Sequence, residues 1–474
     1  MSVIKNSLYN VAYQMITIAI PIITLPYVSR VLGENGIGEY AYTNAIVQYF
    51  ILIGILGINT YGSRQVAYVR DNHNLLSKTF WELMILRLIT CGISYIAYIF
   101  IFVVFNEKNS LIYFLQSLYL IAAMVDISWL FIGIEDFKKT VTRNFIIKVI
   151  GVVCIFAFVK SPDHLTRYIF ILGFTQLLGQ LVMWKYVPQV ISFTHIKSIS
   201  IKTHIIPCIR LFVPQIAAQV YLLLDKIMLG YLVNNYEVGL YDNAQKIIRI
   251  SMTLVTSIGA VLVPRMANLF SRGEMKEFED KVYSSFSLLN LIAIPMAFGL
   301  IAVVYNIKPW LYGDGFNGIE NIIIINSFII VFGTWCNVFG FQCLLPMGKD
   351  NLFTKSVVIG ASVNLVLNML LIKNLKSVGT SVSSLLAELI VPMVQLYFIR
   401  EFIDVKKLFK SIVNYVLCSL AMFIAIKIIT VSMSHSIITV FIQVLVGITV
   451  YVIGLILVKD KNINLVLRHL QKNN

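Results

Sequence analysis

Charged residues are scarce in this chain, and their scarcity excludes a soluble fold. Of 474 residues, only 13% are Asp, Glu, Lys or Arg, whereas 58% are hydrophobic and the mean hydropathy is +0.82. A soluble domain holds roughly 25% charged residues. The longest polar connections, near 63–79, 185–206 and 264–282, are too short to form a soluble domain. The sequence therefore predicts a polytopic membrane protein.

The chain also lacks the motifs of soluble enzymes. It has no Walker A lysine loop, no HExxH and no GxSxG motif. The six Cys form no CxxC pair, and the six His fall in predicted loops or tails without metal-ligand spacing. We therefore expect a membrane transporter rather than an enzyme, with no cofactor and no metal.

Acidic residues are fewer than basic ones, with 23 Asp and Glu against 38 Lys and Arg, and the formal net charge is +15. Most of the 38 Lys and Arg residues lie in short segments on alternate sides of the apolar runs, where they set the orientation of membrane helices. Basic residues in these places meet anionic lipid head groups. The charge therefore indicates a membrane partner and no nucleic acid, with both termini in the cytoplasm.

Apolar runs of about 20 residues recur along the whole chain, and each is long enough to cross a bilayer as a helix. We predict an all-α integral membrane fold of about fourteen transmembrane helices in two pseudo-symmetric six-helix lobes around a central cavity. The predicted domains are 1–206, 207–400 and a C-terminal pair of helices in 401–474. The predicted spans are 8–29, 39–62, 81–105, 111–133, 144–160, 165–186, 208–232, 239–263, 283–306, 319–345, 351–372, 378–399, 411–431 and 437–458.

An internal repeat supports the two lobes. Residues 30–45 read RVLGENGIGEYAYTNA, and residues 225–244 read DKIMLGYLVNNYEVGLYDNA. Both contain Leu-Gly, a short polar stretch, Gly-x-Tyr and an Asn before Ala. Related membrane halves are typical of transporters, whose substrate site lies where the repeats meet.

The eighth predicted span carries charges that need an explanation at bilayer depth. Asp242, Lys246 and Arg249 are spaced i, i+4 and i+7, so they share one helical face. One carboxylate does not neutralise two cations, whereas a phosphate or pyrophosphate would. We therefore interpret this face as part of an anion-binding substrate cavity. The alternatives are ion pairs with acids on other helices and snorkelling to an interface.

Other polar residues in the spans are candidates for the same cavity or for ion coupling. Asp126, Asp225 and Glu388 are candidate ion or proton sites, with a counter-ion role as the alternative. The further substrate-cavity candidates are Arg30, Arg87, Gln215, Gln219 and Lys226.

Two further predictions concern the ends and bends of the helices. The N-terminus is interpreted as an uncleaved first span rather than a signal peptide, and the tail KDKNINLVLRHLQKNN as an amphipathic interfacial helix. Pro21 and Pro214 lie in the first helix of each half, where proline kinks a helix and could serve as a hinge. Ordinary tolerated membrane prolines are the alternative.

Four stretches resemble the polysaccharide repeat-unit (Wzx-type) flippases, members of the superfamily that includes multidrug extruders and lipid II flippases. The first is SLYNVAYQMITIAIPIITLPYVSRVLGENGIGEYAYTNAI at 7–46. The others are DISWLFIGIEDFKKTVTRN at 126–144, LLLDKIMLGYLVNNYEVGLYDNAQKI at 222–247 and VLVPRMANLF at 261–270.

This resemblance implies a flippase that moves undecaprenyl-pyrophosphate-linked oligosaccharide across the cytoplasmic membrane of a bacterium, for capsule, exopolysaccharide or O-antigen synthesis. It implies a hydrated cationic cavity between two lobes, and by position Arg30 corresponds to a cavity-lining arginine. Other implied partners are membrane lipid and the polymerase and glycosyltransferases of the same pathway. The alternatives are a multidrug extruder, a lipid II flippase and a non-transporting scaffold or polymerase.

Overall fold

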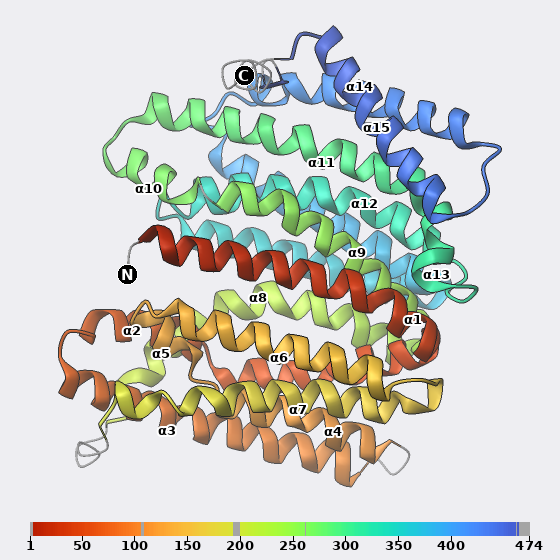
Figure 1. Ribbon diagram of the computed structural model, residues 1–474. Coiled ribbons are helices and arrows are strands. Elements are labelled where there is room, and N and C mark those ends of the chain that lie inside the picture. Colours follow the sequence, from red (N-terminus) through yellow and green to blue (C-terminus); the bar gives the residue numbers. More distant parts are fainter. Residues whose placement is uncertain (1–2, 106–108, 193–199, 261, 461, 464–474) are drawn as a thin grey trace. The chain divides into compact units, whose positions relative to one another are not determined.

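The computed structural model describes residues 3–105, 109–192, 200–260, 262–460 and 462–463. Within these residues every regular element is a helix (Figure 1). In the described part of the chain, eleven helical stretches are long and apolar enough to cross a membrane. The structure therefore confirms an all-α, multi-pass membrane protein. Residues 461 and 464–474 of the predicted tail helix, and the side chains of Pro214 and Gln215, lie outside the described part of the chain.

Two very long helices contain one non-helical residue each. Helix α1 (Val3–Ile55) breaks at Gly33, with φ 67° and ψ 178°, and α13 (Asp350–Ile399) breaks at Lys376, with φ 51° and ψ −130°. Fifty helical residues would measure about 75 Å, more than twice the thickness of a bilayer core. Each break falls between two predicted spans. Fourteen spans nevertheless stays a prediction.

The contacts divide the chain into two units, and the first comprises Met1–Gly230. In it, α4 packs along α7, and α6 also packs along α7 (Figure 1). Aromatic residues fill its core, where the Phe80 ring stacks on the Trp129 ring with centroids 5.6 Å apart. Besides α1, the helices are α2 (Ile58–Val69), α3 (His73–Tyr98), α4 (Ser110–Met124), α5 (Ser128–Gly133), α6 (Phe137–Phe158), α7 (Leu165–Trp184) and α8 (Lys202–Leu232).

A buried hydrogen-bonded triad attaches the first turn of α8 to this unit. His204 Nε2 lies 3.0 Å from Glu82 Oε2 of α3, and His204 Nδ1 lies 2.9 Å from the Tyr61 hydroxyl of α2. The prediction that every His falls in a loop or tail is therefore wrong for His204, and also for His73, which is the first residue of α3. For His204 the prediction failed because polar residues surround it in the sequence, so the start of the helix gave no apolar signal.

The contact division at Gly230 falls later in the sequence than the predicted domain boundary at 206, because α8 packs with the first unit. Contacts measure packing, whereas the predicted boundary rests on the sequence repeat. The division into 1–206, 207–400 and 401–474 thus remains a prediction.

The second unit, Tyr231–Asn474, is organised around α11. Helix α11 packs against α12, α14 and α15, so the predicted C-terminal pair belongs to this core. The Phe286 ring of α11 stacks on Phe339 with centroids 5.2 Å apart. Besides α13, the helices are α9 (Asn235–Ala260), α10 (Val263–Ser271), α11 (Met275–Tyr312), α12 (Ile319–Cys336), α14 (Val405–Thr430) and α15 (Ile437–Leu457).

Local sequence signals set several helix starts. Asn72 Oδ1 accepts hydrogen bonds from the backbone N–H groups of Asn74 and Leu75 and caps α3. Asp404 caps α14 in the same way, and Ser436 caps α15. Each side chain satisfies N–H groups that have no partner inside the helix.

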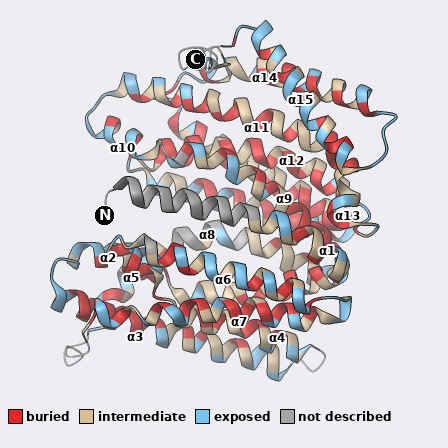
Figure 2. Ribbon diagram, in the orientation of Figure 1, coloured by how far each residue is buried: buried red, intermediate tan, exposed pale blue. Residues whose placement is uncertain are grey.

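Large apolar side chains are exposed along the helices, as expected of surfaces that face lipid. On α15, for example, Leu445 is 65% exposed and Ile448 is 59% exposed. Figure 2 shows exposed residues on α15 beside buried ones on the same helix. In water such a surface would cause aggregation, whereas in a bilayer it is solvated by acyl chains.

Candidate functional site

A polar recess opens in the first unit where α1, α2 and α8 meet. Its volume is about 500 Å³. The last turns of α1 supply Gln48 and the first turn of α2 supplies Asn59 and Thr60, while α8 supplies Gln219. Among the described residues, the rest of the lining consists of Ile51, Leu52, Ile55, Gly57 and Leu223. The recess therefore combines amide and hydroxyl groups with aliphatic walls.

The chain can form this recess because of a glycine between α1 and α2. Leu56 and Gly57 both have positive φ, 51° and 76°, which ends α1 and redirects the chain. A Cβ on Gly57 would lie 2.9 Å from the Cys208 carbonyl oxygen and 3.1 Å from the Phe212 nitrogen. Only glycine allows the backbone of α8 to approach the junction so closely.

We expect Gly57→Ala to destabilise the first unit by about 1–3 kcal/mol, because alanine is strained at this φ and collides with backbone atoms that cannot rotate away. The measurement is thermal unfolding of the purified protein in detergent. Gly92→Ala is the matched control, since a Cβ there meets nothing within 4 Å. A Gly57→Ala protein as stable as the control would contradict this explanation.

Behind the recess lies Arg87, which is 0% exposed. Its Nη1 donates to Asn59 Oδ1 at 2.7 Å, and its Nε donates to the Ala123 carbonyl at 2.6 Å. Its Nη2 lies 3.4 Å from Asp126 Oδ2 and completes an ion pair. A buried guanidinium is tolerated only with such partners. Arg87 thus contacts the recess through Asn59 rather than lining it.

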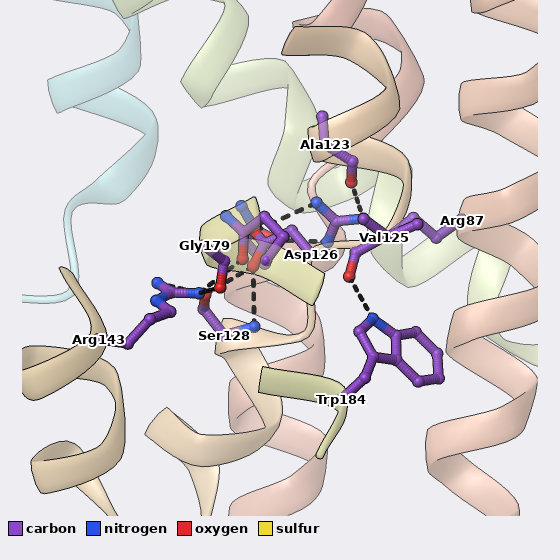
Figure 3. A network of polar contacts seen from close by, with 10 residues as sticks. Arg87, Ala123, Val125, Asp126, Ser128, Arg143, Gly179 and Trp184 are labelled. Atoms are coloured by element: carbon purple, nitrogen blue, oxygen red, sulfur yellow. Dashed lines mark hydrogen bonds and ion pairs between the residues drawn. The ribbon is translucent and has the colours of Figure 1, made fainter. Parts of the chain in front are cut away.

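The network continues from Asp126 through the junction between α4 and α5 (Figure 3). Asp126 Oδ1 accepts from the Ser128 nitrogen at 2.9 Å and from the Ser128 hydroxyl at 2.6 Å. Arg143 of α6 donates to the same hydroxyl at 3.4 Å and to Gln180 Oε1 of α7 at 2.7 Å. One polar chain therefore connects α3, α5, α6 and α7.

In the second unit, the charged face of α9 changes from packed to open along the helix. Lys246 Nζ lies 2.7 Å from Asp242 Oδ2 and donates to Asn243 Oδ1 at 3.2 Å. Asp242 is buried, Lys246 is half-buried and Arg249 is exposed. The predicted common face exists, and it combines one ion-paired cation with a second that solvent or ligand can reach.

A second polar contact holds α9 against the break in α13. Glu237 accepts a hydrogen bond from the Ser377 nitrogen at 3.4 Å and a short one from the Ser377 hydroxyl. Its carboxylate also lies 3.6 Å from Lys376 Nζ. The strained Lys376 backbone is thereby fixed by the helix that carries the charged face.

The other predicted residues occupy varied positions. Arg30 is exposed, Asp225 is buried, and Lys226 and Glu388 are half-buried. Gln219 lines the recess. The structure thus brings Arg87 together with Asp126, and Asp242 together with Lys246. Sequence spacing predicted only the second of these pairs. Whether these residues contact substrate stays a prediction.

Two residues of the site were missed by the sequence analysis. Arg143 lies just before the predicted span 144–160, but α6 begins at Phe137 and Arg143 is only 8% exposed. Asn59 is neutral, so the presence of a charge within a predicted span could not identify it. The motif at 126–144 contained the available hint, since Asp126, Ser128 and Arg143 all belong to it.

Comparison with solved structures identifies the fold. A structure of the lipid II flippase MurJ in an inward closed conformation matches with a TM-score of 0.74 and 16% identity, covering 96% of this chain and 99% of that one. An inward-facing multidrug resistance MATE family transporter of the MOP superfamily matches with a TM-score of 0.58 and 13% identity, covering 85% and 94%. The chain therefore has the fold of these two transporters.

The family follows from sequence. A family model described as "Polysaccharide biosynthesis protein" matches residues 3–270, and the chain belongs to that family. Two relatives carry the name "Putative O-antigen transporter". The one from Shigella dysenteriae is 24% identical over 80% of this chain and 96% of its own length, and the one from Escherichia coli (strain K12) is 20% identical over 85% and 97%. The resemblance seen in the four motifs is confirmed.

Proposed function

We propose that this protein moves undecaprenyl-pyrophosphate-linked oligosaccharide repeat units from the inner to the outer leaflet of a bacterial cytoplasmic membrane. The observation that carries this proposal is the family match over residues 3–270, together with relatives named as O-antigen transporters. The fold shared with a lipid II flippase supports it. The product would serve capsule, exopolysaccharide or O-antigen synthesis by a polymerase and glycosyltransferases, and both termini would be cytoplasmic.

The chemistry of such a substrate fits the residues described above. A pyrophosphate requires cations with freely oriented N–H donors, and the exposed Arg249 beside the paired Lys246 supplies them. An oligosaccharide requires neutral hydrogen-bonding groups, which the recess in the first unit supplies. In this proposal the protein alternates access to the two leaflets and makes no covalent change in the substrate.

The proposed driving force for transport follows from the negative charge of the substrate. An inside-negative potential favours outward movement of an anion by about 2.3 kcal/mol per charge per 100 mV. Proton or sodium coupling would use Asp126, Asp225 or Glu388. Asp126 already accepts two bonds from Ser128 and pairs with Arg87, which favours the counter-ion role for it.

A multidrug extruder is the second candidate, since a MATE transporter shares the fold. A pump for lipophilic cations needs acidic groups facing its substrate. On α9, however, the acid Asp242 is buried against Lys246, and the exposed charge is the cation Arg249. This arrangement favours an anionic substrate.

The deciding experiment measures which leaflet holds the lipid-linked oligosaccharide in cells with and without this protein. We expect the oligosaccharide to accumulate on the cytoplasmic face when the protein is removed, with drug susceptibility unchanged. Normal sidedness combined with greater sensitivity to cationic drugs would reject the flippase and support the extruder.

A further inference from the structure

We propose that the recess between α1, α2 and α8 binds the neutral sugar portion of the substrate, with Asn59 as a hydrogen-bond donor that Arg87 holds in position. This inference rests on the proposed function and extends it. It separates two tasks: cations elsewhere bind the pyrophosphate, whereas amide groups in the recess recognise sugar.

The orientation of the Asn59 amide is fixed by its partner. A guanidinium has only donors, so the atom of Asn59 that faces Arg87 Nη1 at 2.7 Å must be the oxygen. The amide nitrogen, with its two N–H groups, is then directed away from Arg87. Because the Asn59 side chain is exposed and lines the recess, these N–H groups are available to a ligand there.

Arg87 can hold Asn59 because the arginine is itself immobilised. Its Nε is bonded to the Ala123 carbonyl, and its Nη2 pairs with Asp126, which Ser128 fixes in turn. With the bond from Nη1 to Asn59, all three guanidinium nitrogens have a partner, and these contacts restrict rotation of the side chain. Arg87 is thus a positioning residue that contacts no ligand.

The walls of the recess match a sugar better than a phosphate. None of the described lining side chains carries a charge. Gln48, Thr60 and Gln219 each offer both a donor and an acceptor, as sugar hydroxyls require. The aliphatic side chains suit the C–H surface of a sugar ring. The volume of about 500 Å³ lies within the range of small-ligand sites, roughly 300–1,000 Å³.

The test uses Asn59→Asp in the full-length protein in nanodiscs. Aspartate keeps an oxygen facing Arg87, so folding should be preserved, and it replaces the outward N–H donors by a second carboxylate oxygen. The probes are undecaprenyl pyrophosphate without sugar and the lipid-linked oligosaccharide extracted from cells that make it. We expect the wild-type preference for the sugar-bearing lipid to fall about three- to tenfold, the loss of one hydrogen bond, with binding of undecaprenyl pyrophosphate unchanged.

A second variant avoids the added negative charge. Gln48→Leu removes an amide from the wall at similar size, and it should reduce the same preference. Gln176→Leu, at an exposed position of α7 outside the recess, is the matched control and should leave the preference unchanged.

The outcomes separate the two proposals. If the wild-type protein flips the lipid-linked oligosaccharide but Asn59→Asp and Gln48→Leu keep the full preference, the recess is not the sugar site and the proposed function stands. An equal loss for both lipids in Asn59→Asp, with no loss in Gln48→Leu, would likewise overturn the sugar site. A wild-type protein that flips no oligosaccharide lipid overturns the proposed function and this inference with it.

Discussion

Arg87→Gln is expected to destabilise the protein by about 3–5 kcal/mol, since it removes one partner of a buried ion pair. Asp126 would keep its bonds from Ser128 but lose its counter-charge, and the Ala123 carbonyl and Asn59 oxygen would lose their donors. The change should appear as a lower thermal unfolding temperature in detergent and a lower amount of protein in the membrane.

Arg87→Gln combined with Asp126→Asn should recover most of this loss, because the buried charges then disappear together and an asparagine can still accept from Ser128. Arg64→Gln, at an exposed arginine of α2 that is bonded to Tyr68, is the control and should leave stability unchanged. If Arg87→Gln alone unfolds at the wild-type temperature, the network in Figure 3 does not stabilise the first unit.

Lys246→Gln with Arg249→Gln is expected to lower oligosaccharide export about a hundredfold or more. Two charge-assisted hydrogen bonds to a pyrophosphate contribute on the order of 1.5–3 kcal/mol each. Of the two, Arg249 is the exposed residue, so Arg249→Gln alone should account for most of the defect while protein abundance stays normal. Export is measured as the fraction of lipid-linked oligosaccharide in the outer leaflet.

The same double variant would leave Asp242 buried without its lysine, so a folding defect must be distinguished from a transport defect. Adding Asp242→Asn removes that charge and should restore abundance without restoring export. Arg272→Gln with Lys276→Gln, two exposed positions after α10, removes the same formal charge and should leave export intact. Full export by the Lys246, Arg249 double variant would reject the α9 face as a substrate site.

The sequence was most informative where a pattern is local. The Asp242, Lys246 and Arg249 spacing predicted a common face, and the structure has it, because residues three and four apart on one helix are neighbours whatever packs around them. Polar gaps between apolar runs likewise indicated the helix breaks at residues 33 and 376.

The recess and the buried network of Arg87, Asp126 and Arg143 could not be predicted from local sequence patterns. Asn59, Arg87, Asp126 and Arg143 are separated by tens of residues, and no local rule relates them. Their proximity depends on how α2, α3, α5 and α6 pack. Packing also decides which polar atoms a buried guanidinium contacts. It is therefore the reason that Arg87 supports the recess instead of lining it.

Hydropathy and charge spacing by themselves determined that this chain is an all-helical, multi-pass membrane protein with a cationic helix face, since the bilayer admits few other solutions for such a sequence. The four motifs determined its family. Only the tertiary structure decided that Arg87 pairs with Asp126, that α8 packs on the α1–α2 junction through Gly57, and that Asn59, which lines the recess, accepts a hydrogen bond from Arg87. These features depend on contacts between distant segments, whose geometry a one-dimensional pattern does not contain.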